Sequence, residues 1–172
     1  EIVFAGYGIE DKNYNDYDGR DVKGKIVLIF AGEPQVNGEY VVSGTDKRSS
    51  WGYSTTRKAA LAKEKGAIAV LLVNPTWDSI PTKLAESSKS TNLLFPHLND
   101  KARVAVVTIL SSFLKNMMGE SDASRILEAV KVKAPLNAIS FDKKIKTKLV
   151  FKKISIKAEA SNVLGYIEGT DK

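Results

Sequence analysis

Cysteine is absent from this 172-residue sequence, and histidine occurs only once, as His97. Without cysteine the chain forms no disulfide and offers no thiolate to a metal ion. A hydrolytic zinc site generally takes several histidine or cysteine ligands beside carboxylates, and a single histidine does not build one. The sequence therefore predicts no catalytic residue, no bound cofactor and no metal site in this chain.

Other absences exclude further classes of protein. No segment approaches the roughly 20 apolar residues of a membrane-spanning helix, and no serine lies in a nucleophile-elbow pattern. The net charge is +6, and nine lysines lie between positions 131 and 157. Arginine is scarce in that stretch, and its lysines alternate with aliphatic residues, as on a solvated strand face. We therefore expect neither a membrane span nor a nucleic-acid partner.

A helix followed by a buried strand dominates what is present. Residues 55–74 begin with a helical pattern in which Ala59, Ala62 and Gly66 share one face of small side chains, which suits close packing on a sheet. Gly66 is placed to end the helix, because the residue after the last turn often needs a positive φ. The apolar run 68–73 then predicts a strand covered on both faces, ended by Asn74 and Pro75.

Further strands and helices are predicted on either side of this unit. Runs 26–30 and 104–109 read as two more buried strands, and a short strand opens the chain. Asn37-Gly38 predicts a hairpin turn. We expect two helices between residues 111 and 130, capped by Ser111 or Ser112 and by Ser121 or Asp122. The apolar faces predicted from helical spacing are Phe113, Leu114 and Met117 in the first helix and Ala123, Ile126, Leu127 and Val130 in the second. The tail predicts strands near 145–158, with a bulge near Lys152-Lys153, and at 163–167.

Two short motifs have a functional and a structural interpretation. Gly6-Tyr7-Gly8 lacks the further glycines and the following helix of a phosphate loop, so we interpret it as a tight bend. Residues 11–15 begin like a calcium loop, but that loop needs glycine where Asp16 stands and glutamate where Val22 stands. We interpret this segment as a solvated polar turn.

Candidate binding residues lie in predicted loops. Arg48, Trp51 and Tyr53 place a cation and two large aromatic rings in the polar segment 43–54, and Trp77 opens the long polar segment 75–103. Tryptophan is usually buried in a core. Loops on a rigid scaffold nevertheless collect binding groups, and aromatic residues and arginine commonly anchor interfaces. We predict that these four residues form a binding surface.

Three segments together resemble the protease-associated (PA) domain. Lys58-Ala59-Ala60-Leu61-Ala62-Lys63-Glu64-Lys65-Gly66-Ala67 and the run to Asn74 are similar to its core motif. Two flanking segments resemble the PA domain inserted in co-catalytic zinc aminopeptidases. The first is Val3-Phe4-Ala5-Gly6-Tyr7-Gly8-Ile9 together with Tyr17-Asp18-Gly19-Arg20-Asp21-Val22-Lys23-Gly24-Lys25-Ile26-Val27. The second is the ending Ser161-Asn162-Val163-Leu164-Gly165-Tyr166-Ile167-Glu168-Gly169-Thr170-Asp171. Residues 75–103 and 115–145 carry no motif that we can place in that family.

The resemblance implies an α+β fold, a small mixed β-barrel or sandwich of the swivelling β/β/α type with two or three flanking helices. It implies one domain over 1–172, excised from a larger peptidase, with residues 160–172 leading to an absent catalytic domain that holds the zinc. The domain would be non-catalytic, with its own peptidase domain in cis and a peptide or protein substrate as partners. Arg48, Trp51, Tyr53 and Trp77 would face the cleft, in an extracellular, periplasmic or cell-envelope location.

Two other functions stay open at this point. The chain could be a binding module for a protein or glycan, independent of any peptidase. It could also be a self-sufficient enzyme that uses His97, although no base or anion-binding frame surrounds Phe95-Pro96-His97-Leu98. The reading frame on either side of the segment distinguishes the first two functions, and an activity screen tests the third.

Overall fold

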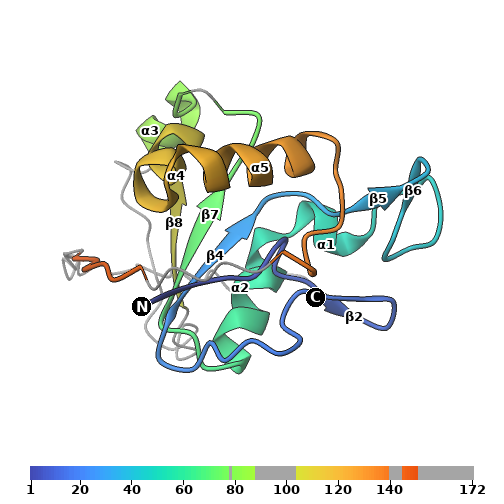
Figure 1. Ribbon diagram of the computed structural model, residues 1–172, viewed down its shortest axis with the longest axis horizontal. Helices are drawn as coiled ribbons and strands as arrows, with labels where there is room; N and C mark the ends of the chain where they lie inside the picture. The colour runs from blue at the N-terminus through green and yellow to red at the C-terminus, as the bar shows by residue number, and fades with distance from the viewer. Residues whose placement is uncertain (78, 88–103, 140–144, 151–172) are drawn as a thin grey trace, which may run out of the picture.

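A four-stranded parallel sheet forms the centre of the computed structural model (Figure 1), which describes residues 1–77, 79–87, 104–139 and 145–150. Its strands lie in the order β1-β4-β7-β8, and each pairs in parallel with its neighbours. They are β1 (Ile2–Phe4), β4 (Ile26–Phe30), β7 (Ala69–Val73) and β8 (Ala105–Ile109).

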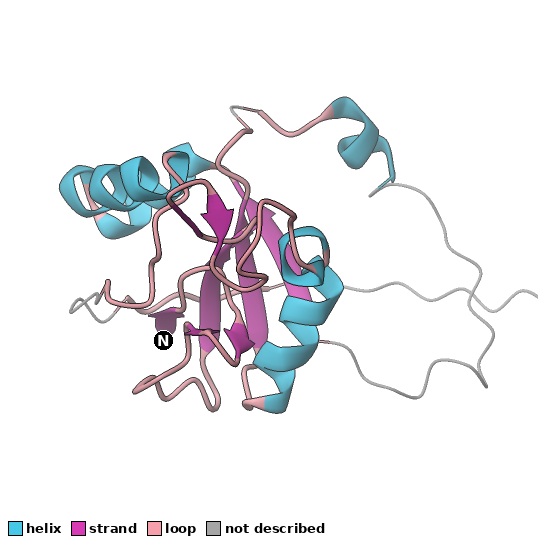
Figure 2. Cartoon of the chain, turned by 90° about the vertical axis from the view of Figure 1, so that its right-hand side faces the viewer, coloured by secondary structure: helices cyan, strands magenta, loops and turns pink. Residues whose placement is uncertain are grey.

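The two central strands, β4 and β7, are buried along their whole length, as their continuous apolar sequences predict. Successive side chains point to opposite faces, so Leu28 and Leu71 join the core on one side while Ile29 and Val70 join the core on the other. Helices cover both sides of the sheet (Figure 2). The third predicted strand, β8, is only partly buried, because among the described strands it pairs on one side alone.

Helix α2 (Thr55–Glu64) covers one face of the sheet, as predicted. Ala62 is fully buried against this face, and its small side chain lets the helix lie close to the sheet at this point. Ser54 caps its N-terminus by accepting from the N–H of Arg57, and Gly66 follows its end at a φ of 88°. The strand begins one residue later than predicted, at Ala69, and Ile68 is 61% exposed.

Helices α4 (Ser111–Met118) and α5 (Glu120–Lys131) pack against the opposite face. Both helices were predicted, but their caps differ from expectation: Leu110 and Gly119 occupy the N-cap positions, without a side-chain hydrogen bond. In α4 the buried residues are Leu114 and Met118, whereas Phe113 is exposed. The predicted apolar face of α5 is confirmed, with Ala123, Ile126 and Val130 buried and Leu127 packed beside them.

Short elements complete the described residues. Two antiparallel ribbons, β2 (Glu10–Asp11) with β3 (Tyr14–Asn15) and β5 (Gln35–Val36) with β6 (Glu39–Tyr40), lie outside the main sheet. The second confirms the hairpin, since Asn37 and Gly38 both have positive φ. The segment predicted as a loop contains helix α1 (Ser50–Tyr53), and residues 75–103 contain α3 (Thr82–Ser87).

The predicted tail strand is not seen in residues 145–150, which form only one antiparallel bridge, from Ile145 to Ile2. The bulge near Lys152-Lys153, the strand at 163–167, the linker 160–172 and His97 lie outside the described residues. The expected α+β class is confirmed, with a parallel sheet, antiparallel ribbons and flanking helices.

Candidate binding site at the carboxyl ends of the strands

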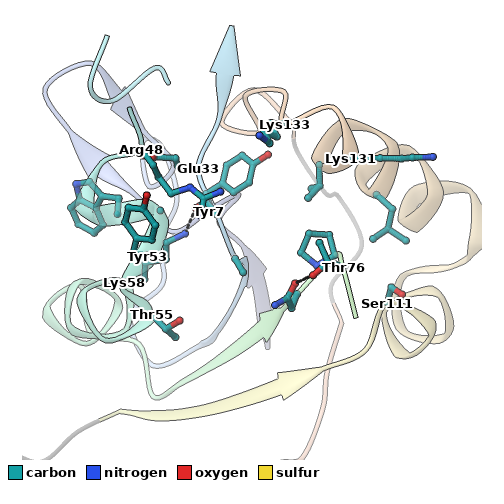
Figure 3. A pocket seen from close by; sticks show the side chains of 18 of the residues that line it. Tyr7, Glu33, Arg48, Tyr53, Thr55, Lys58, Thr76, Ser111, Lys131 and Lys133 are labelled. Carbon is teal, nitrogen blue, oxygen red and sulfur yellow. Dashed lines mark hydrogen bonds between the residues drawn. The ribbon is translucent and has the colours of Figure 1, made fainter. Parts of the chain in front are cut away.

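A cavity of about 730 Å³ opens where the strands of the parallel sheet end (Figure 3). Its lining includes the segments that follow three strands: Ala31 to Glu33 after β4, Asn74 to Thr76 after β7, and Ser111 after β8. The carboxyl ends of parallel strands meet at one edge of a sheet, and the crevice outside that edge is where open α/β sheets bind ligands. Helix α2 and the end of α5 supply the side walls.

Lys58 reaches this cavity from α2, although the residue is only 2% exposed. Its ammonium donates to the carbonyl oxygens of Phe30, at 3.2 Å, and Gly32, at 2.5 Å. Burial lowers the pKa of Lys58 to about 8, and the negative charges of Asp16 and Glu33 oppose this shift. Lys58 therefore fixes the chain as it leaves β4.

Glu33 fixes the next segment in the same way. It is 2% exposed, and its carboxylate accepts from the N–H of Ser49, at 2.6 Å, and from the Ser49 hydroxyl, at 2.5 Å. The Ser49 oxygen in turn accepts from the N–H of Trp51 and caps α1. One buried carboxylate thus holds the start of α1 at the end of β4.

Arg48 lies beside this junction and presents its charge to the cavity. A Cβ on Gly52 would lie 2.4 Å from the Cγ of Arg48, so only glycine leaves room for the arginine stem. The Arg48 guanidinium carbon lies 4.9 Å from the centroid of the Tyr53 ring and 5.9 Å from that of Tyr40. The ammonium of Lys133 lies 5.7 Å from the same Tyr40 ring.

The structure brings three of the four predicted site residues to this cavity, namely Arg48, Trp51 and Tyr53. Arg48 is exposed, and the Tyr53 side chain is 72% exposed, so both are accessible. Trp51 is only 4% exposed: its indole N–H donates to Asp11 at 2.8 Å, and the Arg57 guanidinium stacks on the ring at 3.9 Å. Trp51 is therefore a core residue that supports the wall.

Trp77, the fourth predicted residue, does not line the cavity. It is half-buried, and its N–H donates to the Asn74 carbonyl at 3.2 Å, in the turn that follows β7. Thr76 stands on the cavity wall in its place.

A second cluster of polar groups lies in the N-terminal segment and is closed to solvent. The Asp16 carboxylate accepts from the N–H groups of Tyr7, at 2.9 Å, and Ile9, at 3.1 Å, and from the Tyr14 hydroxyl, at 2.7 Å. Burial raises the pKa of Asp16 to about 6, against the lowering effect of these hydrogen bonds and of the charge of Lys58. A Cβ on Gly6 would lie 2.1 Å from an Asp16 oxygen, so the bend at residues 6–8 accommodates a buried carboxylate.

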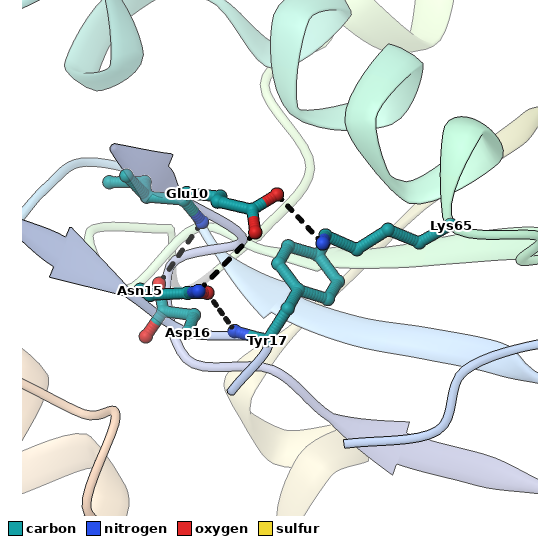
Figure 4. A network of polar contacts seen from close by, with 6 residues as sticks. Glu10, Asn15, Asp16, Tyr17 and Lys65 are labelled. Carbon is teal, nitrogen blue, oxygen red and sulfur yellow. Dashed lines mark hydrogen bonds and ion pairs between the residues drawn. The ribbon is translucent and has the colours of Figure 1, made fainter. Parts of the chain in front are cut away.

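The ribbon next to Asp16 confirms the polar turn predicted for residues 11–15. Glu10 forms an ion pair with Lys65 at 2.7 Å and accepts from Asn15 at 3.3 Å (Figure 4). Asn15 also accepts from the N–H of Tyr17. These groups bond to one another, and no cluster of three or more histidine, cysteine or acidic side chains suited to a metal ion occurs within the described residues.

Sequence patterns did not indicate Lys58, Glu33 or Lys133 as site residues. Lys58 had one available signal, because it stands four residues before Ala62 and so faces the sheet. Glu33 lies in the short segment that follows β4, which places it at the carboxyl edge of the parallel sheet. Lys133 had no local signal, since only the packing of α5 brings it to the cavity.

Comparison with protein families gives a match to the PA domain over residues 1–113. This match spans well over half of the chain, and the chain belongs to the PA domain family. Searches among curated proteins and among solved structures gave no match. Membership indicates a protease-associated accessory role or a protein-binding role, in a domain type that is typically non-catalytic. Of the helices in the described residues, none has the length and apolar character needed to cross a membrane.

Proposed function

We propose that this chain is the non-catalytic accessory domain of a zinc-dependent aminopeptidase, in which it covers the active-site cleft and controls substrate access. The observation that carries this proposal is the PA domain match over residues 1–113. The likeness of residues 3–9, 17–27 and 161–171 to the PA domain inserted in zinc aminopeptidases supports this particular parent. By the same likeness, we propose that the protein acts outside the cell or in the cell envelope.

The zinc of such an enzyme would be held by a different segment of the protein. The chain has no cysteine and one histidine, and the part described by the structure offers no cluster of metal-binding side chains. The residues present therefore do not fit a catalytic zinc site, and no step of peptide hydrolysis is assigned to them.

The cavity at the strand ends supplies the contact with the polypeptide. Arg48 and Tyr53 are accessible on its wall, whereas Lys58, Glu33 and Trp51 are buried and hold that wall in place. A rigid wall with an exposed arginine and an exposed tyrosine has the composition of an interface anchor. Such a surface binds without ordering its own side chains first, which lowers the entropic cost of association.

The test begins with the reading frame that contains this segment, expressed as the full-length protein. We expect zinc-dependent aminopeptidase activity, and we expect Arg48→Ala and Tyr53→Ala to change kcat/KM across a peptide series while the fold is retained. The matched control is Lys47→Ala, an exposed neighbour outside the cavity lining. A reading frame without a peptidase domain would contradict the proposed parent and favour an independent protein- or glycan-binding module.

A further inference from the structure

We propose that the cavity binds polypeptides through a carboxylate, held between Arg48 and Lys133. This inference names the ligand chemistry of the proposed accessory site and rests on its polypeptide-binding role. The two cations come from segments far apart in the sequence, and both approach the ring of Tyr40, at 5.9 Å and 5.7 Å. Figure 3 shows them on the same side of the cavity, near Tyr7.

The charge balance of the cavity favours an anion. Four basic side chains line it, Arg48, Lys58, Lys131 and Lys133, against two acidic ones, Glu33 and Glu128. Glu33 is buried and already accepts two hydrogen bonds from Ser49. Throughout the described residues, Arg48 and Lys133 have no carboxylate within ion-pair distance, since the four ion pairs found there involve other residues.

The backbone of Lys133 gives an independent reason to assign it a function. Its φ is 56°, and it stands just past the end of α5, a position that usually carries glycine. A lysine in this conformation is strained, and such strain tends to be kept where the side chain has a task. The side chain placed here is a cation on the wall of the cavity.

The surroundings of Arg48 suit a carboxylate. The guanidinium is a planar fork that binds carboxylates through two parallel hydrogen bonds. Its stem lies over Gly52 and its charged end is near the rings of Tyr40 and Tyr53, so its position is largely set before a ligand arrives. The exposed Tyr53 ring adds an apolar contact for the chain that bears the carboxylate.

Two sources supply a carboxylate in a peptide, the C-terminus and the side chains of aspartate and glutamate. The probes are therefore three labelled peptides built on one sequence of glycine, serine, alanine and leucine. The first has a free C-terminal carboxylate, the second a C-terminal amide, and the third the amide with two internal glutamates. Binding to this chain is followed by NMR amide shifts and by fluorescence anisotropy at low and high salt.

We expect the first or the third peptide to bind at least about tenfold more tightly than the neutral amide, and to lose affinity as salt rises. Shifts should be centred on Arg48, Gly52 and Lys133. Whichever of the two binds more tightly identifies the source of the carboxylate. Equal binding of all three peptides, or no binding at millimolar concentration, overturns the inference.

Three variants test the residues. Lys133→Gly removes the cation and suits the backbone, and Gly52→Ala displaces the Arg48 stem without changing the charge; each should weaken carboxylate binding about tenfold. Lys47→Ala removes an equal charge outside the cavity and should leave binding within about twofold. Equal losses in Lys47→Ala and Lys133→Gly would mean bulk attraction only and would overturn the site. These measurements need no peptidase, so a wrong parent assignment and a wrong ligand assignment give different results.

Discussion

The Asp16 cluster and the Arg48 cavity both collect polar groups around the same sheet, but they find their partners in different ways. Asp16 is fully buried and accepts hydrogen bonds from Tyr7, Ile9 and Tyr14. The cavity presents Arg48 and Lys133 to solvent, and neither has a carboxylate partner among the described residues. A buried group left unpaired would cost stability, whereas an exposed cation without a partner costs little and remains available to a ligand.

The closed cluster also reaches beyond the residues matched by the family. The Tyr14 hydroxyl accepts from the N–H of Leu136, at 3.0 Å, and Arg20 donates to the carbonyls of Asn137 and Ile139. These bonds hold the segment after α5, which carries Lys133 to the cavity. The Asp16 cluster thus fixes the architecture on which the cavity presents its charges.

The largest effect on stability is expected from Asp16→Ala. It leaves two N–H groups and a hydroxyl buried without their acceptor, so the free energy of unfolding should fall by roughly 3 kcal/mol or more. Asp18→Ala, two residues away and exposed, should change it by less than about 0.5 kcal/mol. Urea unfolding of both variants gives the comparison. Similar midpoints for Asp16→Ala and wild type would show that the cluster does not hold the fold.

The next effect concerns α2, which belongs to both regions because it carries Ala62 into the core and Lys58 to the cavity. Ala62 is 0% exposed against the sheet, so Ala62→Leu overpacks the contact and should cost roughly 1–3 kcal/mol. Lys63→Leu, on the outer side of the helix, should cost much less. Equal urea midpoints for the two variants would contradict the assignment of the Ala62 face of α2 as the one that contacts the sheet.

The pH dependence of stability isolates Lys58, which links the two regions. Its pKa is about 8 in the folded chain, against an ordinary value of 10.5. Between these values the unfolded chain binds more protons than the folded one, so stability rises with pH in this window. The contribution from pH 7 to pH 9 should be about 1 kcal/mol.

The control for that measurement is Lys58→Met, which removes the titrating group and keeps much of the side-chain volume. Asp16 does not interfere, because its pKa of about 6 confines its effect to more acidic solution. There the sign is opposite: stability falls as pH rises from about 4 to 6. Parallel pH profiles for wild type and Lys58→Met above pH 7 would exclude the lowered pKa of Lys58.

The smallest effect on stability is expected from Lys133→Gly, which should stabilise the fold while it weakens peptide binding. Lys133→Gly replaces a strained residue at φ 56° with one that suits this conformation, so the free energy of unfolding should rise by about 0.5–1 kcal/mol. The same variant should bind carboxylate peptides more weakly. Thermal or urea unfolding measures the first quantity. A destabilised Lys133→Gly variant would mean that the lysine serves the fold and is not held there for a ligand.

Much of the architecture follows from local patterns in the sequence. The apolar runs predict β4 and β7 because side chains buried on both faces leave no alternation. Ala62 predicts the close packing of α2 because its side chain is small. Gly66 predicts the end of α2, and Asn37-Gly38 predicts a hairpin, because these residues adopt positive φ more readily than others. The prediction that Phe113 lies on the apolar face of α4 was wrong, and so were the predicted N-cap residues of α4 and α5. In each case several neighbouring residues had the side-chain chemistry that a buried or a capping position requires.

The sequence by itself determined the buried strands, the main helix, the PA family and the candidate status of Arg48 and Tyr53, because each depends on residues close together in the chain. The parallel pairing of the strands came from the structure. Only the tertiary structure decided that Trp51 is buried, that Trp77 lies off the cavity, and that Lys58 and Glu33 support its wall. It alone brought Lys133 to the same cavity as Arg48, although the two residues are 85 positions apart in the sequence. Burial and the meeting of distant charges depend on how helices and strands pack, and no local pattern encodes that.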